Sequence, residues 1–545
     1  MSELSANPID SKEEDLYTIP HPRRSLLGIF ISTFFLRVAF GSTTVLMPIY
    51  IFQHLKGMAG WGGQFSIIVV EITYALAVIV SSGYFGFRSD TSNSKRWILI
   101  GTAAGGIILM GYGICALNWD GWIGITPLVN GLMIFGMSIY HFLHGLAGSC
   151  KVNASYGYIS RFSVYETRAT RIGFYNVFVT GGRAVGVILA GVLYDLIVGV
   201  TQYHLSIITF NFTEISTKGI SYFKEGFFSL AFLSESKLTD WVPIFPTRLV
   251  YLYLLFGFAI LISAVIVYFM LDKTRSVVKE EKYSIKKELL TSWRMIKDKG
   301  RRGIVLPLLG TASILGILNN WGFLVLSLES TPGAASWTTV LFTLAMGAPM
   351  ALWGWLADKI GRRKTLWIGV AGLLIMSVMI GIAFFGNYLT GGNPWTNPES
   401  QFDASGFIQP QNLWLTILLV ISLLMGSAYF PAISGRLGDS SSLGVTDEAV
   451  DETKELERTA EFHGATMSIQ QTILSISEII GIIVGGLALM IVYALANTAT
   501  NFAYNMIGMI VPILILLIFT TIVSFLWPAE EDFIETSKVR RKELS

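Results

Sequence analysis

Charge and cysteine are both scarce in this sequence of 545 residues. Asp, Glu, Lys and Arg make up 14% of the chain, against roughly a quarter of an ordinary soluble domain, so the composition does not suit a water-exposed surface. The formal net charge is only +2, which gives no indication of nucleic-acid binding. The two cysteines, Cys115 and Cys150, lie in or beside apolar segments. We interpret them as packing residues, without a disulfide or metal role.

Several catalytic and targeting motifs are missing as well. No Walker loop or other nucleotide cradle is visible, so neither direct use of ATP nor a cofactor is expected. The chain lacks His-Glu-x-x-His and Gly-x-Ser-x-Gly, clusters that a membrane-embedded enzyme would need. Residues 1–24 are polar and acidic and have no short apolar core, so no signal peptide is expected.

Long apolar runs are what the chain has in abundance. Hydrophobic residues make up 52% of it, and they gather in runs of about 20, the length that a helix needs to cross the apolar core of a bilayer. We therefore predict an all-α membrane protein with twelve transmembrane helices. The predicted spans are 25–52, 63–87, 97–118, 125–150, 173–199, 248–271, 303–328, 335–357, 366–388, 412–434, 466–495 and 503–527.

The distribution of Lys and Arg predicts that both termini are cytoplasmic. With the N-terminus inside, the cytoplasmic segments hold 32 of the 39 basic residues and the outer loops hold five. Four of the 32 follow the fourth span, beginning with Lys151, and the remaining two, Arg37 and Arg183, lie inside the membrane. An excess of cytoplasmic Lys and Arg of this size sets the orientation of a membrane protein.

The basic segment 272–302 divides the spans six and six. Its part 284–299 is either an amphipathic helix on the inner membrane face or a solvated tether. An outer loop carries a glycosylation sequon at Asn211, which matters only in a cell that has the machinery. The predicted organisation is a cytoplasmic N-tail 1–24, an N-terminal six-helix half 25–271, a basic cytoplasmic linker 272–302, a C-terminal six-helix half 303–527 and a cytoplasmic C-tail 528–545.

A motif follows the eighth span, in the sequence Gly354-Trp-Leu-Ala-Asp358-Lys-Ile-Gly361-Arg362-Arg363-Lys364. Gly354 is expected to let the helix end pack closely on a neighbour, and Gly361 to permit the reversal into the next helix. Asp358 is expected to place a negative charge near adjacent helix N-termini. The three cations that follow hold the loop on the cytoplasmic side.

A degraded copy of the motif follows the second span, in the sequence Gly86-Phe-Arg-Ser-Asp90-Thr-Ser-Asn93-Ser-Lys95-Arg96. Asp90 takes the place of the acid, and Lys95 with Arg96 that of the basic pair. Asn93 stands where the second glycine belongs, a tolerable exchange because Asn also adopts positive φ. Two copies, each directly after the second helix of a six-helix half, indicate an internal repeat.

Both loops resemble the signature loop of the major facilitator superfamily, Gly-x-Leu-Ala-Asp-Arg-x-Gly-Arg-Arg/Lys. The resemblance covers the whole membrane region and indicates no particular subfamily. The chain departs from related carriers at His141-Phe-Leu-His144-Gly145, where Arg-x-x-Gln-Gly is common, and at Gly182-Arg-Ala-Val-Gly186, which lacks the proline of drug/proton antiporters. The resemblance implies two six-helix halves that rock about a central site, so that a secondary transporter works by alternating access.

Ionisable residues near mid-span are the second functional signal. Each costs about 2.5–3.5 kcal/mol at the bilayer centre unless it is paired or hydrated. Spans 3, 6, 9 and 12 carry no charge in their apolar cores, and the resembled fold places these helices at the periphery. The candidate substrate and coupling residues are Arg37, Glu71, His141, His144, Arg183, Asn319, Asn320 and Glu478.

Structural roles for the same residues remain open. Arg37 and Glu71 form an ion pair in one interpretation, and Glu478 is a hydrogen-bonded packing residue in another. In the functional interpretation, Arg37 and Arg183 indicate an organic anion as substrate. Glu71, Glu478 or His141 then couples its movement to protons by titrating differently in the two orientations.

The sequence thus predicts a secondary active transporter, not an enzyme, that moves a small organic solute with H⁺ as coupling ion. We expect a functional monomer in the lipid bilayer of the plasma membrane, with no metal, cofactor or nucleic acid as partner. The alternatives are a facilitative uniporter, a drug or metabolite efflux carrier, and a membrane sensor derived from a transporter. A sensor would be expected to lose its charges inside the membrane, whereas this chain keeps them.

Overall fold

The computed structural model describes residues 20–51, 61–115, 126–161, 165–198, 248–274, 299–322, 332–387, 410–440, 463–496 and 502–525. The regular elements in these stretches are all helices. Residues 1–19, residues 284–298, Asn211 and the C-tail lie outside the described residues, so the expectations for them stay predictions.

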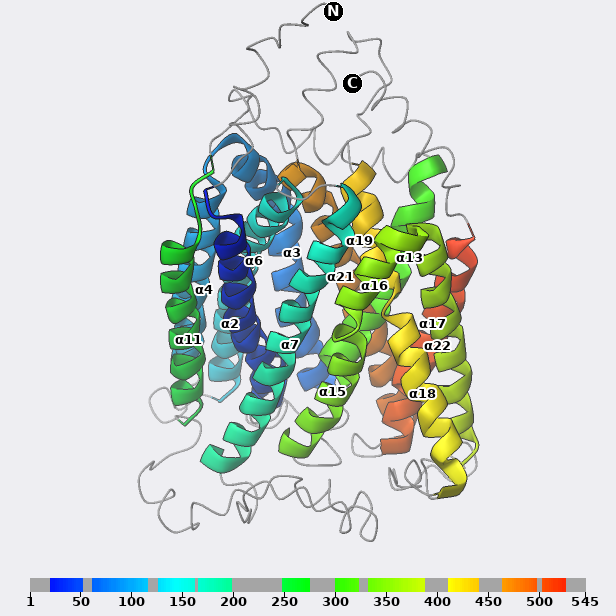
Figure 1. The fold of residues 1–545 in the computed structure, drawn as a ribbon. Coiled ribbons are helices and arrows are strands. Elements are labelled where there is room, and N and C mark those ends of the chain that lie inside the picture. The colour runs from blue at the N-terminus through cyan, green and yellow to red at the C-terminus, as the bar shows by residue number, and fades with distance from the viewer. Residues whose placement is uncertain are drawn as a thin grey trace, which may run out of the picture.

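The helices lie side by side and run along one common direction (Figure 1). The first group is α2 (Pro22–Ile49), α3 (Trp61–Thr91), α4 (Ser94–Cys115), α6 (Thr126–Arg161), α7 (Tyr165–Val198) and α11 (Arg248–Met270). The second group is α13 (Lys299–Ile317) with the π-helical η2 (Leu318–Gly322), α15 (Pro332–Gly347), α16 (Met350–Ile360), α17 (Arg362–Phe385), the 3₁₀ turn η4 (Pro410–Asn412), α18 (Leu413–Gly426), α19 (Tyr429–Ser440), α21 (His463–Ala496) and α22 (Phe502–Ser524).

Ten helical stretches among the described residues are long and apolar enough to cross a membrane. They confirm the prediction of an all-helical, multi-pass membrane protein. α6 is long enough as well, but His141 and His144 in its middle lower its hydropathy. The predicted eighth span is broken into α15 and α16 by a turn at Ala348 and Pro349, where proline lacks the N–H that a continuous helix requires.

The two groups of helices meet along two seams. Within the first group α2 packs on α7, α3 on α6, and α4 on both α6 and α11. Within the second group α13 packs on α21 and α22, and α17 on α18. Between the groups, α3 packs against α21, and α7 packs against α15 and α16 (Figure 1). Any side chain on the inner faces of α3, α7 or α21 therefore lies between the two groups.

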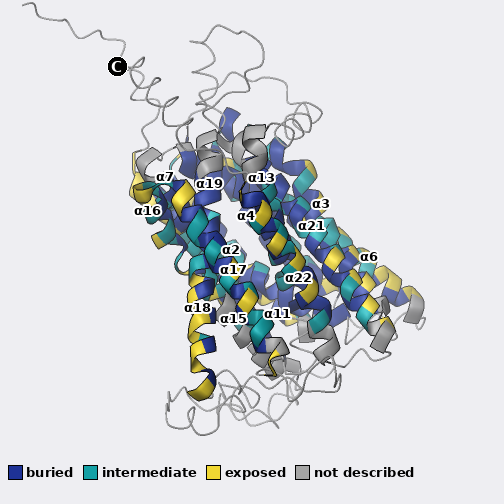
Figure 2. Cartoon of the chain, turned by 90° about the vertical axis from the view of Figure 1, so that its right-hand side faces the viewer, coloured by how far each residue is buried: buried dark blue, intermediate teal, exposed yellow. Residues whose placement is uncertain are grey.

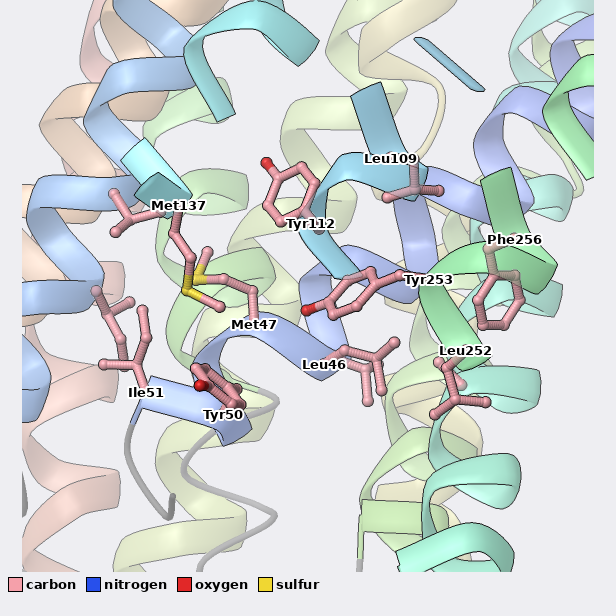
Figure 3. Close-up of a cluster of buried hydrophobic side chains, with 14 of the residues drawn as sticks. Leu46, Met47, Tyr50, Ile51, Leu109, Tyr112, Met137, Leu252, Tyr253 and Phe256 are labelled. Atoms are coloured by element: carbon pink, nitrogen blue, oxygen red, sulfur yellow. The ribbon is translucent and has the colours of Figure 1, made fainter. Parts of the chain in front are cut away.

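A buried core contains side chains of both groups, and Figure 3 shows part of its contribution from the first group. Tyr112 of α4 and Tyr253 of α11 stack there with their ring centroids 5.5 Å apart. Trp321 of η2 is fully buried in the same cluster, and its indole N–H donates a hydrogen bond to the Ile482 carbonyl of α21 at 3.0 Å. The indole N–H of Trp321 is thus hydrogen-bonded inside the core, as buried polar groups in a membrane interior must be.

Apolar side chains remain exposed along the outer faces of the bundle (Figure 2). Ile107 of α4, Phe258 of α11, Val378 of α17 and Ile518 of α22 are each more than half exposed. Such a surface is unfavourable in water and suited to lipid. These four helices correspond to the predicted spans 3, 6, 9 and 12, for which the sequence predicted a peripheral position.

The position of Lys151 differs from the prediction that this residue belongs to a cytoplasmic loop. The sequence analysis placed it in the loop after residue 150, but α6 continues to Arg161 and the Lys151 side chain has no exposed surface. The polar stretch around it is buried because its groups bond within the bundle. Asn153, for example, donates to the Ser149 hydroxyl at 3.1 Å and to the Ser82 carbonyl at 3.3 Å.

Asp272 connects the end of α11 to the start of α2 through hydrogen bonds. Its carboxylate accepts hydrogen bonds from the His21 N–H at 2.8 Å, the Arg24 guanidinium at 2.7 Å and the Ser25 hydroxyl at 3.2 Å. Burial alone would raise the pKa of this carboxyl, but the hydrogen bonds outweigh burial and the pKa lies below its ordinary value. The stabilisation is therefore complete above about pH 3.9, and it is lost as the pH falls through the lowered pKa of the folded state.

An Asp272→Asn variant is expected to unfold at a lower temperature than the wild type at neutral pH. The difference should disappear as the pH is lowered past the native pKa of Asp272, below about 3.9, because the wild-type carboxyl is then protonated too. Thermal unfolding of the purified protein in detergent across this range measures it. Lys273→Met, a change at the next and exposed residue, serves as the control. A loss of equal size at every pH would contradict the ion-pair account.

Candidate functional site

Glu71 of α3 and His141 of α6 are buried together between neighbouring helices. The His141 Nε2 lies 3.2 Å from the Glu71 Oε2, and its Nδ1 is hydrogen-bonded to the Tyr112 hydroxyl of α4. When Glu71 is ionised and His141 is neutral, Nε2 donates to the carboxylate and Nδ1 accepts from the Tyr112 hydroxyl. The three side chains form a continuous hydrogen-bonded path that can hold or pass a proton.

Arg37 of α2 and Arg183 of α7 share one aromatic partner. Their guanidinium carbons lie 5.2 and 5.7 Å from the centroid of the Phe40 ring, within the range of a cation–π interaction. Within the described residues, neither guanidinium has a carboxylate oxygen within 4.0 Å. The ion pair of Arg37 with Glu71, one of the two interpretations left open by the sequence, is thus not formed here, because Glu71 contacts His141 instead.

Glu478 of α21 brings a carboxyl from the second group to the same region. It interacts electrostatically with Glu71, Arg183, His141 and Arg37. These five residues are hereafter the charged cluster. The structure therefore gathers at one place the four mid-span charges that the sequence singled out, and adds His141 to them. The two groups of helices both contribute, through α21 on one side and through α2, α3, α6 and α7 on the other.

Aromatic rings surround the charged cluster on the side of the first group. The Tyr74 ring lies 5.3 Å from that of His141, 5.9 Å from that of His144 and 5.2 Å from that of Phe40. His144 is buried, and its Nδ1 has no hydrogen-bond partner among the described residues. His144 therefore packs beside the charged cluster with one polar atom unused.

Asn319 and Asn320 are not brought to the charged cluster. Both lie in η2, where the Asn320 amide donates to the Gly316 carbonyl of its own helix at 2.8 Å. Asn320 is buried and Asn319 is half-buried, and in the described part of the chain neither is hydrogen-bonded to a residue of the charged cluster. The sequence assigned both side chains to the central cavity because of their position in the span. In the structure the Asn320 amide is hydrogen-bonded within its own helix instead.

Four side chains beside the site were missed by the sequence analysis: Phe40, Tyr74, Tyr112 and Lys151. Phe40 and Tyr74 each follow a mid-span charge by three residues, a spacing that puts both members on one helix face. That spacing was the available signal for these two. Tyr112 sits in a peripheral, uncharged span, and Lys151 lay beyond the predicted end of its helix, so neither carried a signal in the sequence.

Asp358 joins the loop after α16 to the start of α7. Its Oδ2 accepts hydrogen bonds from the backbone N–H and the hydroxyl of Thr170 at 2.8 and 2.7 Å. Arg362 lies 3.6 Å from the other carboxylate oxygen and donates to the Gly435 carbonyl of α19 at 3.1 Å. Arg362 is buried and takes part in the contact, whereas Arg363 is exposed, as expected of a cation that fixes topology.

The two glycines of this loop have the geometry that their predicted roles require. Gly361 has a φ of 97°, a conformation that side-chain-bearing residues rarely adopt, and the chain reverses there from α16 into α17. A Cβ at Gly354 would lie 2.5 Å from the Ala169 carbonyl oxygen of α7. Glycine is therefore needed at this position for α16 to touch α7.

The loop after α3 makes different contacts from the matching loop after α16. The expectation of positive φ for Asn93 was wrong, since Asn387 alone among the described non-glycine residues has it. The Asn93 side chain instead accepts hydrogen bonds from the N–H groups of Lys95 at 3.1 Å and Thr274 at 3.3 Å. The Lys95 ammonium donates to two carbonyls at the end of α11, at 2.6 and 2.7 Å. These contacts around the buried Asp90 stay within one group of helices.

The chain is similar to known proteins in fold, and part of it matches a family model. The model of the Major Facilitator Superfamily matches residues 226–391. A bacterial homologue of the human lysosomal transporter Spinster, inward-facing and unoccupied, shares 13% identity with a TM-score of 0.54 over 94% of this chain and 97% of that chain. A bacterial homologue of the iron transporter ferroportin, outward-facing, shares 13% identity with a TM-score of 0.54 over 92% and 98%. A variant of the E. coli fucose:proton symporter FucP shares 14% identity with a TM-score of 0.50 over 93% and 99%.

No protein of curated function matches the sequence. The likeness to the solved structures, at 13–14% identity, shows the fold alone. The family match adds sequence evidence in the region that contains the loop after α16. The shared fold, the family match and that loop together confirm the resemblance to the major facilitator superfamily that was predicted from the sequence.

Proposed function

We propose that the chain is a secondary active transporter that moves a small organic anion by alternating access, coupled to protons. Two six-helix halves, residues 25–271 and 303–527, rock about the charged cluster and expose it to each side of the membrane in turn. The twelve helices place both termini in the cytoplasm, and the protein works as a monomer in the plasma membrane. The fold, which is that of membrane transporters, supports transport in general.

The charged cluster is the observation that carries this proposal. Ionisable side chains inside a membrane are costly and mark substrate and ion pathways. Here they come from helices of both groups and meet where the groups meet. A rigid structural role needs no such arrangement, since each group could satisfy its own polar residues. A transporter-derived sensor would be expected to lose these charges, which disfavours that alternative.

Proton coupling is assigned to Glu71, His141 and Glu478. The Glu71–His141 hydrogen bond of 3.2 Å holds a proton between a carboxylate and an imidazole. Rocking of the halves moves α21 relative to α3, so the solvation and charge environment of Glu478 and Glu71 differs between the two orientations. A carboxyl that is hydrated in one orientation and enclosed in the other binds a proton differently in each. FucP, named a fucose:proton symporter, has the same fold.

Arg37→Lys and Arg183→Lys are each expected to raise the KM for the transported anion about tenfold. The planar guanidinium offers two parallel donors to a carboxylate, which the lysine ammonium does not, and a loss of about 1.4 kcal/mol corresponds to this factor. Initial uptake rates against substrate concentration measure the KM. Arg24→Lys, at the cytoplasmic end of α2, is the matched control. An unchanged KM in both variants would make the arginines structural.

Reconstitution tests the proposed function as a whole. A ligand is first found by thermal-shift screening of a metabolite library, because a ligand that binds only the folded protein raises its stability. Its uptake into proteoliposomes is then followed with an imposed pH gradient, with and without a protonophore. Accumulation that collapses with the protonophore supports proton coupling. Equilibration without accumulation supports a uniporter, and accumulation that follows sodium contradicts the proton version.

A further inference from the structure

Lys151 is a fully buried lysine that the proposed mechanism does not use. It lies in α6, and its ammonium donates one hydrogen bond, to the Thr33 hydroxyl of α2 at 3.1 Å. Gly101 of α4 packs closely on this residue: a Cβ at Gly101 would lie 2.7 Å from the Lys151 backbone nitrogen and 3.0 Å from its Cβ. A lysine ammonium has three donors, so two of them have no partner among the described residues.

No acidic residue in the described part of the chain balances the Lys151 charge. The charged side chain that acts on it is Arg37, which is a second cation. Taken with the charged cluster, the basic residues Arg37, Lys151 and Arg183 outnumber the carboxyls Glu71 and Glu478 by one. Burying a cation without a counter-ion is strongly unfavourable, so this region is suited to receive one negative charge.

A series of neighbouring hydroxyl groups begins at Thr33, which the Lys151 ammonium contacts. Ser155 lies one helical turn from Lys151 on α6, and Tyr175 of α7 faces both Ser155 and Thr33. The buried hydroxyl of Tyr175 lies within hydrogen-bonding reach of the Thr33 and Ser155 hydroxyls, but the geometry of these contacts is poor. Buried polar groups in proteins are almost always hydrogen-bonded. These weakly bonded hydroxyls, together with an ammonium that uses one of its three donors, can bind an acceptor that a ligand supplies.

From this geometry we infer that Lys151, Thr33, Ser155 and Tyr175 form a binding site for the carboxylate group of the transported solute. These four residues are hereafter the Lys151 site. It lies on the cytoplasmic side of the charged cluster, because Thr33 precedes Arg37 by one turn of α2. This assignment rests on the proposed transporter function for its biological meaning. The binding it describes is measurable whether or not transport occurs.

A carboxylate fits the Lys151 site better than a phosphate. The excess of one basic residue balances a single negative charge, whereas a phosphate near neutral pH brings up to two. The ammonium and the three hydroxyls place their donors around a small region, which suits two oxygens carrying one charge. The solute would then meet Arg37 and the Lys151 site in succession as it moves along α2.

Thermal unfolding of the full-length protein in detergent tests the Lys151 site with defined probes. Sodium acetate, sodium phosphate and sodium chloride are compared at equal ionic strength. The wild type is expected to unfold roughly 2 °C or more higher in acetate than in chloride. Lys151→Met keeps the length of the side chain and should lose this shift. Lys273→Met, an exposed lysine at the end of α11, should retain it. General salt effects act on all variants alike and cancel in the comparison.

Tyr175→Phe and Ser155→Ala test the same site without changing its charge. Each removes one hydroxyl and should reduce the acetate shift without abolishing it. An equal acetate shift in the wild type and in Lys151→Met would overturn the inference, as would the absence of any shift in the wild type. A larger shift in phosphate than in acetate, lost in Lys151→Met, would overturn the assignment to a carboxylate. A protein that binds acetate through Lys151 but transports nothing would overturn only the proposed transport function.

Discussion

Glu478→Gln is expected to yield a carrier that exchanges its substrate across the membrane but cannot concentrate it. Glutamine keeps the size of the side chain and removes its ability to bind and release a proton. With one proton per solute, a gradient of one pH unit supplies about 1.4 kcal/mol, which corresponds to a tenfold accumulation. The variant should reach equal concentrations inside and outside, whereas the wild type should reach a ratio of about ten under the same gradient.

Two uptake experiments separate loss of coupling from loss of function in this variant. Exchange of labelled for unlabelled substrate needs only the movement of the loaded carrier, so it should continue in Glu478→Gln. Accumulation under a pH gradient needs proton release and should be absent. Asp272→Asn, which removes a carboxylate just after the end of α11 and outside the charged cluster, should accumulate like the wild type. Full accumulation by Glu478→Gln would exclude Glu478 from coupling and leave Glu71 and His141 as candidates.

Asp358→Asn is expected to lower the transport rate about tenfold while leaving membrane insertion intact. The Asp358 carboxylate accepts two hydrogen bonds from Thr170 across the contact between the two groups of helices. Hydrogen bonds to a charged acceptor contribute about 1.5–3 kcal/mol each. Losing the charge shifts the balance between the two orientations by an amount of that order, and about 1.4 kcal/mol in a barrier is a factor of ten in rate.

The matching change after α3 should have a smaller effect. Asp90 lies in the last turn of α3, and the described contacts of the loop that follows run to α11 in the same group of helices, so Asp90→Asn is expected to disturb the contact between the groups less than Asp358→Asn does. Thr170→Val removes one of the two donors to Asp358 and should fall between the two aspartate variants. Expression level and elution volume on size exclusion show that insertion is normal. Equal rates in wild type and Asp358→Asn would remove the gating role of this loop.

Placement of the charges could be predicted from the sequence because bilayer energetics leave few choices. A charge in a span must face other protein or water. The mid-span residues Arg37, Glu71, Arg183 and Glu478 could therefore be assigned to the interior, and the structure brings them together. The geometry of the loop after α16 could also be predicted, because the backbone at Gly361 has a conformation that favours glycine.

Partners within the interior could not be predicted in the same way. Glu71 pairs with His141 rather than with Arg37, a choice that depends on helix rotation and on distances that a single sequence does not contain. Lys151 was misplaced because hydropathy ends a span where polar residues begin, whereas α6 continues with its polar groups bonded inside the bundle. Asn93 does not have the positive φ that was expected, and its side chain accepts a hydrogen bond from the Lys95 N–H instead.

Proton movement driven by substrate tests the central claim most directly, and it can be measured before the solute is identified. The purified protein is reconstituted into liposomes that contain a pH-sensitive dye, and pools of organic anions are added outside at constant pH. The account predicts acidification of the interior with at least one pool, absent in empty liposomes and in Glu478→Gln, and abolished by a protonophore. No acidification with any pool, while labelled solutes from the same pools enter the vesicles, would contradict it.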